Sequence, residues 1–128
     1  MAARMTKEHP DPTTGAGPNE AVNEVRLVGR VSQDPEERVL PSGDSLWTFR
    51  LVVARTGDRG ESRQTVDVLD CAVWGGRVLR SIARWKAGDV VEVGGAVRRR
   101  FFRGAGGTAS RVEVEVSTGR LIRRAATG

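Results

Sequence analysis

The chain has little of what enzymes and metal proteins usually require. Its 128 residues include one histidine, one cysteine and no tyrosine, and aromatic residues make up 5% of it. His9 and Cys71 are too few to build a zinc site. The P-loop, G-x-S-x-G and H-E-x-x-H motifs are all missing. We therefore expect no catalytic residues, no metal and no cofactor, and predict that the protein is not an enzyme.

Long apolar segments are also missing. No run approaches the roughly 20 residues that a membrane-spanning helix needs, and the first residues have no apolar stretch of the kind found in secretory signals. A single cysteine cannot form an internal disulfide, which fits a reducing compartment. These absences predict a cytoplasmic protein without a membrane partner.

The first residues contain almost nothing that a core could bury. "MAARMTKEHPDPTTGAGPNEA" is rich in proline, glycine, threonine and charge, so we predict that residues 1–21 are a disordered tail. The remaining length suits one domain with a single modest core. We place that domain at residues 22–123, followed by a short flexible C-terminus at 124–128.

What the chain does have is positive charge. The formal net charge is +5, and arginine outnumbers lysine 19 to 2. Residues 1–21 carry a net −1, so the rest of the chain carries +6. Genome composition explains a preference for arginine over lysine, but it does not explain the positive excess. Such a domain attracts polyanions, of which nucleic acid is the commonest.

Alternating apolar and polar residues predict five strands. They cover residues 23–31, 46–54, 66–74, 89–102 and 110–118, and "GRLIRR" is a candidate extension of the last one. Gly94-Gly95 predicts a bend or bulge in the fourth strand. A turn at 41–44 follows the breakers Asp34-Pro35, and residues 55–65 form a long polar loop.

The period changes to that of a helix in "RVLRSIARWKAG". Val78, Leu79, Ile82 and Trp85 recur at helical spacing, and Gly88 occupies the position of a C-cap glycine. Three strands, a helix and two strands are the order of the OB-fold. We therefore predict an all-β, five-stranded Greek-key barrel with one helix between strands three and four.

Five stretches, in this order, resemble the bacterial single-stranded DNA-binding protein family. They are "NEVRLVGRVSQDPEER", "PSGDSLWTFRLVVAR", "VDVLDCAVWGG", "WKAGDVVEVGGAVRRRFF" and "VEVEV". The resemblance covers about residues 22–123. It implies a protein that binds single-stranded DNA without strong sequence preference during replication, recombination or repair. It also implies a homo-oligomer, a tetramer in this family.

The resemblance places base-stacking aromatics at Trp74 and Phe102. Stacking on rings tolerates any base, and arginines follow the phosphates. Alternation puts Arg98 and Arg100 on the same side of the strand as Phe102. The expected binding residues are Trp74, Phe102, Arg98, Arg100, Arg50, Arg55 and Arg103. The other interpretations are that Trp74 is a buried cap of the barrel and that the arginines are solvated charge.

Several residues depart from the family pattern. Val68 stands where many members have an aromatic residue, and Asp70 shares its face. The loop 55–65 has no aromatic residue, although Arg55, Arg59 and Arg63 supply charge there. The chain ends in the basic "RRAATG" instead of an acidic, Phe-ending tip, so we expect no recruitment of partner proteins through such a tip.

Other assignments stay open at this point. Phe101 faces the opposite side from Phe102, and Trp47 shares the apolar face of the second strand, so each is either a core or a contact residue. Cys71 is expected to be a small core residue. Two other functions fit the pattern: an OB-fold accessory protein of replication restart that acts mainly through protein contacts, and an RNA-binding, cold-shock-like module.

Overall fold

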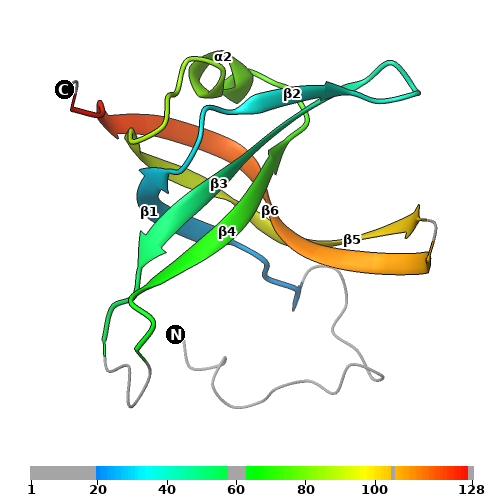
Figure 1. Cartoon of the computed structure of the whole chain (residues 1–128), viewed down its shortest axis with the longest axis horizontal. Helices are drawn as coiled ribbons and strands as arrows, with labels where there is room; N and C mark the ends of the chain where they lie inside the picture. The colour runs from blue at the N-terminus through cyan, green and yellow to red at the C-terminus, as the bar shows by residue number, and fades with distance from the viewer. Residues whose placement is uncertain (1–19, 58–62, 105, 127–128) are drawn as a thin grey trace.

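A computed structural model of the protein describes residues 20–57, 63–104 and 106–126. The elements are β1 (Val25–Val31), β2 (Glu36–Val39), β3 (Ser45–Ala54), β4 (Val66–Val73), α2 (Val78–Ile82), β5 (Val90–Gly104) and β6 (Gly107–Arg123), as Figure 1 shows. The tail expected at the N-terminus, apart from its last two residues, lies outside the described residues. So do Arg59 and the last two residues of the chain.

Five strands form a closed barrel. Neighbouring strands follow the order β1-β5-β6-β4-β3, and antiparallel pairing of β1 with β3 closes the ring. The pairing of β4 with β6 is parallel and joins only Cys71 to Val114 and Ala72 to Glu115. The predicted OB-fold barrel, with its helix between β4 and β5, is confirmed.

A sixth strand, β2, lies outside the ring and was not predicted. It pairs with the first half of β3, from Glu36 opposite Thr48 to Val39 opposite Ser45. All four of its residues are exposed. A strand without a buried side has no alternation of apolar and polar residues, so the sequence pattern showed only the breakers and the turn around it.

The core fills the barrel and one of its ends. Trp85 is 2% exposed and meets Phe49 edge to face, with ring centroids 5.6 Å apart. The predicted apolar stripe of the helix is confirmed, since Ile82 is buried and Val78 and Leu79 pack on the core. In Figure 1, α2 lies over the end of the barrel that holds this stripe.

The helix is shorter than the predicted segment 77–88. It ends at Ile82, and short i to i+3 bonds follow it, from Arg84 N–H to the Ser81 carbonyl and from Trp85 N–H to the Ile82 carbonyl. Gly88 has a positive φ of 91°, but its N–H donates to the Val31 carbonyl. It therefore turns the chain back to β1, and its assignment as the helix C-cap was wrong.

Strands β5 and β6 form a long hairpin that extends beyond the barrel (Figure 1). They have 15 and 17 residues, more than the predicted 89–102 and 110–118. The predicted irregularity is confirmed by a register shift between Gly94 and Gly95. A Cβ at Gly95 would lie 1.9 Å from the Glu115 carbonyl oxygen, so only glycine allows the two strands to approach this closely.

Candidate nucleic-acid interface

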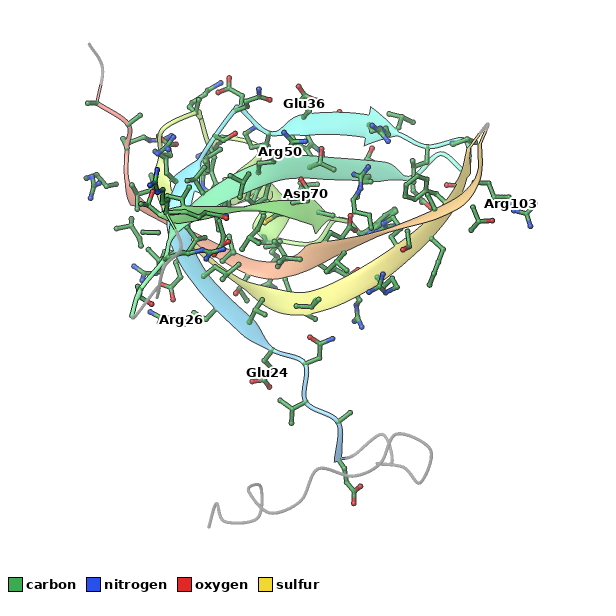
Figure 2. The ribbon with its side chains drawn as sticks, turned by 60° about the horizontal axis from the view of Figure 1, so that its bottom comes forward. Glu24, Arg26, Glu36, Arg50, Asp70 and Arg103 are labelled. Carbon is green, nitrogen blue, oxygen red and sulfur yellow. The ribbon has the colours of Figure 1, made fainter. Side chains whose placement is uncertain are left out.

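A groove of about 480 Å³ lies between β2, the outer side of β3 and β4, and the β5–β6 hairpin. Figure 2 shows Glu36, Arg50 and Asp70 beside one another on β2, β3 and β4, and Arg103 at the distant end of the hairpin. The walls carry both signs of charge, three aromatic side chains and the apolar side chains of Leu40 and Leu46. The charged and aromatic residues that line the groove are Asp34, Glu36, Arg38, Phe49, Arg50, Asp70, Trp74, Arg100, Phe102, Arg111 and Glu113.

Trp74 stands directly after β4, where the strand ends. Gly75 and Gly76 follow with φ angles of 134° and 91°, a conformation that L side chains rarely adopt, and no atom lies within 4 Å of a Cβ built on either. Trp74 is 38% exposed. It lines both the groove and an adjoining recess of about 650 Å³ that contains Arg77 and Arg98. Trp74 therefore borders both hollows, and its exposure shows that it is not a buried cap.

Arg100 connects Trp74 to a buried carboxylate. Its Nε and Nη2 atoms donate to one oxygen of Glu113 at 2.9 and 2.7 Å, and Glu113 is 6% exposed. The guanidinium carbon lies 4.7 Å from the centre of the Trp74 ring. Arrangements of this kind are favourable cation–π contacts. Glu113 thus holds Arg100 over the indole.

Phe102 occupies the next position along the same side of β5. It is 42% exposed and lines the groove. The guanidinium of Arg111, which is opposite Arg100 in the register, lies 5.6 Å from the centre of the Phe102 ring. The groove therefore contains two exposed aromatic rings, each with an arginine against it.

The remaining expected residues are spread more widely. Arg50 lines the groove, Arg98 lines the adjoining recess, and neither Arg55 nor Arg103 is part of either lining. Four of the expected arginines form ion pairs with carboxylates: Arg50 with Asp70 at 3.1 Å, Arg55 with Asp67 at 2.9 Å, Arg98 with Glu115 at 2.9 Å and Arg100 with Glu113 at 2.7 Å. Within the described part of the chain, Arg103 has no such partner.

The groove is electrically balanced. Its lining contains four arginines and four carboxylates, so its formal charge is zero. The adjoining recess has Arg77 and Arg98 against Glu24 and Glu115, which also balance. The positive excess of the domain therefore lies outside both hollows.

Sequence reasoning missed Arg38, Arg111 and Leu46 as groove residues. Arg111 was predictable from the sequence, because a hairpin turn after Gly104 places Arg111 opposite Arg100. Leu46 is 7% exposed and lies opposite Arg38 in the pairing of β3 with β2. Its place in the groove was not predictable, because β2 was not predicted.

The two aromatic residues left open have different surroundings. Trp47 is partly buried and packs against the core. Phe101 is 67% exposed, so it does not pack inward within the chain. Val68 is 55% exposed on the outer face of β4, where it pairs with Val52.

Cys71 is buried beneath the groove, as expected for a small core residue. Burial, with the neighbouring carboxylates of Asp70 and Glu113, raises the pKa of its thiol to about 12. No three metal-ligating side chains gather among the described residues, and none of the described helices is long and apolar enough to cross a membrane.

Comparison with known proteins agrees with this geometry. Residues 22–122 match the Single-strand binding protein family. Single-stranded DNA-binding protein 3 of Listeria innocua is 37% identical over 87 residues, which are 67% of this chain and 54% of that protein. Single-stranded DNA-binding protein A of Bacillus subtilis is 34% identical over 82 residues, which are 63% of this chain and 47% of that protein. The chain thus spans about half the length of these curated relatives.

A solved structure shares the fold. The Plasmodium falciparum SSB complex with ssDNA matches with a TM-score of 0.65 and 26% identity, covering 80% of this chain and 95% of that one. The match to the family runs through every strand of the barrel and the residues that line the groove. The chain therefore belongs to the Single-strand binding protein family.

Proposed function

We propose that this protein binds single-stranded DNA in the groove, without strong preference for sequence, and protects strands during replication, recombination or repair. The observation that carries the proposal is the pair of exposed rings, Trp74 and Phe102, that line a groove which also contains arginines. Every base has a π-face, so stacking on such rings contributes roughly 1–3 kcal/mol per base whatever the base is.

Trp74 and Phe102 act as the stacking platforms, and Arg50, Arg98, Arg100 and Arg103 contact phosphates in this proposal. Arg55 extends the charged surface toward the β3–β4 loop. Because Arg50, Arg98 and Arg100 are paired with carboxylates, each phosphate competes with a carboxylate for its arginine. Stacking then supplies more of the affinity in the groove than net charge does.

The protein acts on DNA as a homo-oligomer in the cytoplasm and has no catalytic step. A homotetramer follows the family pattern, and several joined grooves multiply the avidity for one long strand. Mass in solution, with and without a dT oligomer, measures the number of copies.

Quenching of tryptophan fluorescence tests the proposal. Trp85 is buried and Trp47 is packed on the core, so the signal reports mainly on Trp74. Adding a dT oligomer of about 10 nucleotides, within the range that one OB-fold covers, should quench the emission. A Trp74→Phe variant should bind with little quenching.

Competing nucleic acids in this titration distinguish the proposed function from the RNA-binding module and from the accessory protein. Double-stranded DNA of the same length should compete poorly, because its bases are not available for stacking. Equal competition by a matched RNA oligomer would indicate an RNA-binding module. Absence of binding to all three nucleic acids would refute the proposal and favour the accessory protein that acts through protein contacts.

A further inference from the structure

Part of the positive charge that is missing from the groove lies at α2. Arg77, Arg80 and Arg84 are exposed on the helix and the turn that follows it, and Arg124 comes from the segment after β6. We call these four residues the helix arginine surface. Its position is a consequence of packing: Val78, Leu79, Ile82 and Trp85 face the core, so the residues between them must face outward.

A recess of about 300 Å³ lies at the centre of this surface. Arg80, Ser81, Arg84 and Arg124 surround it, and Trp85 and Leu121 form its floor. Its lining contains three arginines and no carboxylate. Arg80 and Arg84 also have no carboxylate partner anywhere in the part of the chain that the structure describes.

Hydrogen bonds to Asp89 and to the Arg84 carbonyl fix the position of Arg124. Its Nη1 atom donates to Asp89 at 3.0 Å and to the Arg84 carbonyl at 3.2 Å. Asp89 is 1% exposed and also accepts the N–H groups of Lys86 and Ala125, each at 2.9 Å. Asp89 therefore pairs with Arg124, and the positive charge at the recess comes from Arg80 and Arg84.

The surface continues from the recess beside Trp74. That recess contains Gly75, Gly76 and Arg77, and Arg77 directly precedes α2. Residues three and four apart on a helix are about 5–6 Å apart at Cβ. Arg77 and Arg80 have such a separation at the start of α2, and Arg80 and Arg84 line the same recess, so the three arginines lead away from the aromatic ring.

We propose that the helix arginine surface is a second phosphate-binding surface, which binds the backbone of a single strand after it has passed Trp74. This inference rests on the proposed function and extends it. It assigns stacking to the balanced groove and most of the net electrostatic attraction to α2. A nucleic-acid backbone fits better than an acidic peptide with an apolar anchor, since Trp85 is 2% exposed and leaves little apolar surface in the recess.

The test compares two variants that lose the same charge. Arg80→Gln with Arg84→Gln changes the helix arginine surface. Arg26→Gln with Arg30→Gln changes two exposed arginines on β1. In Figure 2, Arg26 lies on the side of the molecule away from β2. All four side chains are exposed, so melting temperatures should stay close to that of the parent protein.

Affinity is measured over a range of salt concentrations for dT oligomers of about 8 and about 40 nucleotides, one within and one beyond the site of a single OB-fold. The helix variant should bind the short oligomer as the parent does and the long one about five-fold or more weakly at low salt. Its salt slope for the long oligomer should be shallower by about 1.4, the value for two phosphates on a single strand. The β1 variant should change both values much less.

The outcomes separate the two proposals. If the parent protein binds neither oligomer, the proposed function fails. If it binds both, and the helix variant has the same affinity and slope for the long oligomer as the β1 variant, the second surface is refuted and the groove remains. If poly-glutamate binds the parent but not the helix variant, while DNA binding is unchanged, the surface serves a protein partner and the inference is wrong.

Discussion

Arg100 is the residue at which charge and stacking meet. It contacts the buried carboxylate of Glu113 and the face of Trp74 at the same time. A lysine here could not form the same planar contact with both partners, because only guanidinium is flat and forked. The contribution of each partner to DNA binding is therefore measurable by changing Glu113 and Trp74 separately.

Replacing Trp74 tests the stacking platform. Trp74→Ala should weaken binding by about 1–3 kcal/mol per occupied site, and Trp74→Phe by less, because a smaller ring still stacks. The stability loss should stay below the roughly 3–5 kcal/mol of a fully buried aromatic, since the ring is 38% exposed. Melting temperature and dT affinity measure the two effects. A large melting loss with unchanged affinity would assign the ring to the core.

Replacing Glu113 tests the competition between carboxylate and phosphate. Glu113→Gln keeps the size of the side chain but removes its charge, so Arg100 should become available to a phosphate. We expect tighter dT binding with a salt slope steeper by about 0.7, one more phosphate contact. The stability loss should be about 1 kcal/mol, because the amide oxygen still accepts a hydrogen bond. Weaker binding would show that Glu113 acts by holding Arg100 over Trp74.

The residues of the groove were only partly predictable. Alternation along residues 97–104 was enough to put Arg98, Arg100 and Phe102 on one side, as the structure has them. Their ion pairs were not predictable, because Glu113 and Glu115 reach these arginines only through the register of β5 with β6. That register includes the shift at Gly94 and Gly95, which changes every pairing beyond it.

At the scale of elements, the strands with a buried side were the predictable ones. β1 alternates in the way that its sequence indicates, whereas the last three residues of β4 are all buried; both strands were assigned within two residues. β2 has no buried side, and its position depends on its partner β3. The helix was overextended because Trp85 keeps the helical phase although the chain has already left α2.

The Asp89 network joins three elements and should make stability depend on pH. Burial opposes ionisation of Asp89, but hydrogen bonds from the Ala125 and Lys86 N–H groups, together with Arg124, lower its pKa below the ordinary 3.8. A lowered pKa means that the folded state prefers the charged form. The contribution is therefore complete above a pH of about 4 and is lost as the pH falls through the lower folded value.

Asp89→Asn measures this contribution. At neutral pH the variant should lose about 1–3 kcal/mol, because Arg124 and two N–H groups lose a charged acceptor. The difference in melting temperature from the parent should narrow in acid, where Asp89 of the parent becomes neutral. Glu92, whose pKa is lowered by Arg120 and Arg26, titrates in both proteins and cancels in the comparison. If the difference in melting temperature does not change as the pH is lowered, the loss of stability is due to packing and not to the charge of Asp89.

For the whole molecule, charge and recognition are separated in space. The region after residue 21 carries a net +6, yet the groove lining is formally neutral. Composition alone predicted attraction to polyanions, and the barrel was predictable from the order of its elements. The position of the positive charge was not predictable, because it depends on which arginines have no carboxylate partner in the folded protein.

This separation predicts how sequence and salt affect binding. Logarithmic affinity should fall linearly with logarithmic salt concentration, at about 0.7 per phosphate neutralised. The slope should be the same for dT and dC oligomers, because phosphates do not differ between them, while the affinities at one salt concentration should differ through stacking. Titrations of both oligomers at several salt concentrations check this. Slopes that depend on the base would mean that the strand follows different arginines.

The stack of Arg100 on Trp74 also affects how firmly a strand is held. In the free protein the indole already has a cation over its ring, so a base that binds on that side takes the place of a favourable contact. When the base leaves, the guanidinium of Arg100 returns to the ring of Trp74, so the ring face is not exposed to solvent. The free energy that separates the two states is therefore a difference between two favourable contacts, and we infer that single bases leave and rebind often. A complex of this kind favours diffusion of the protein along the strand over residence at one register.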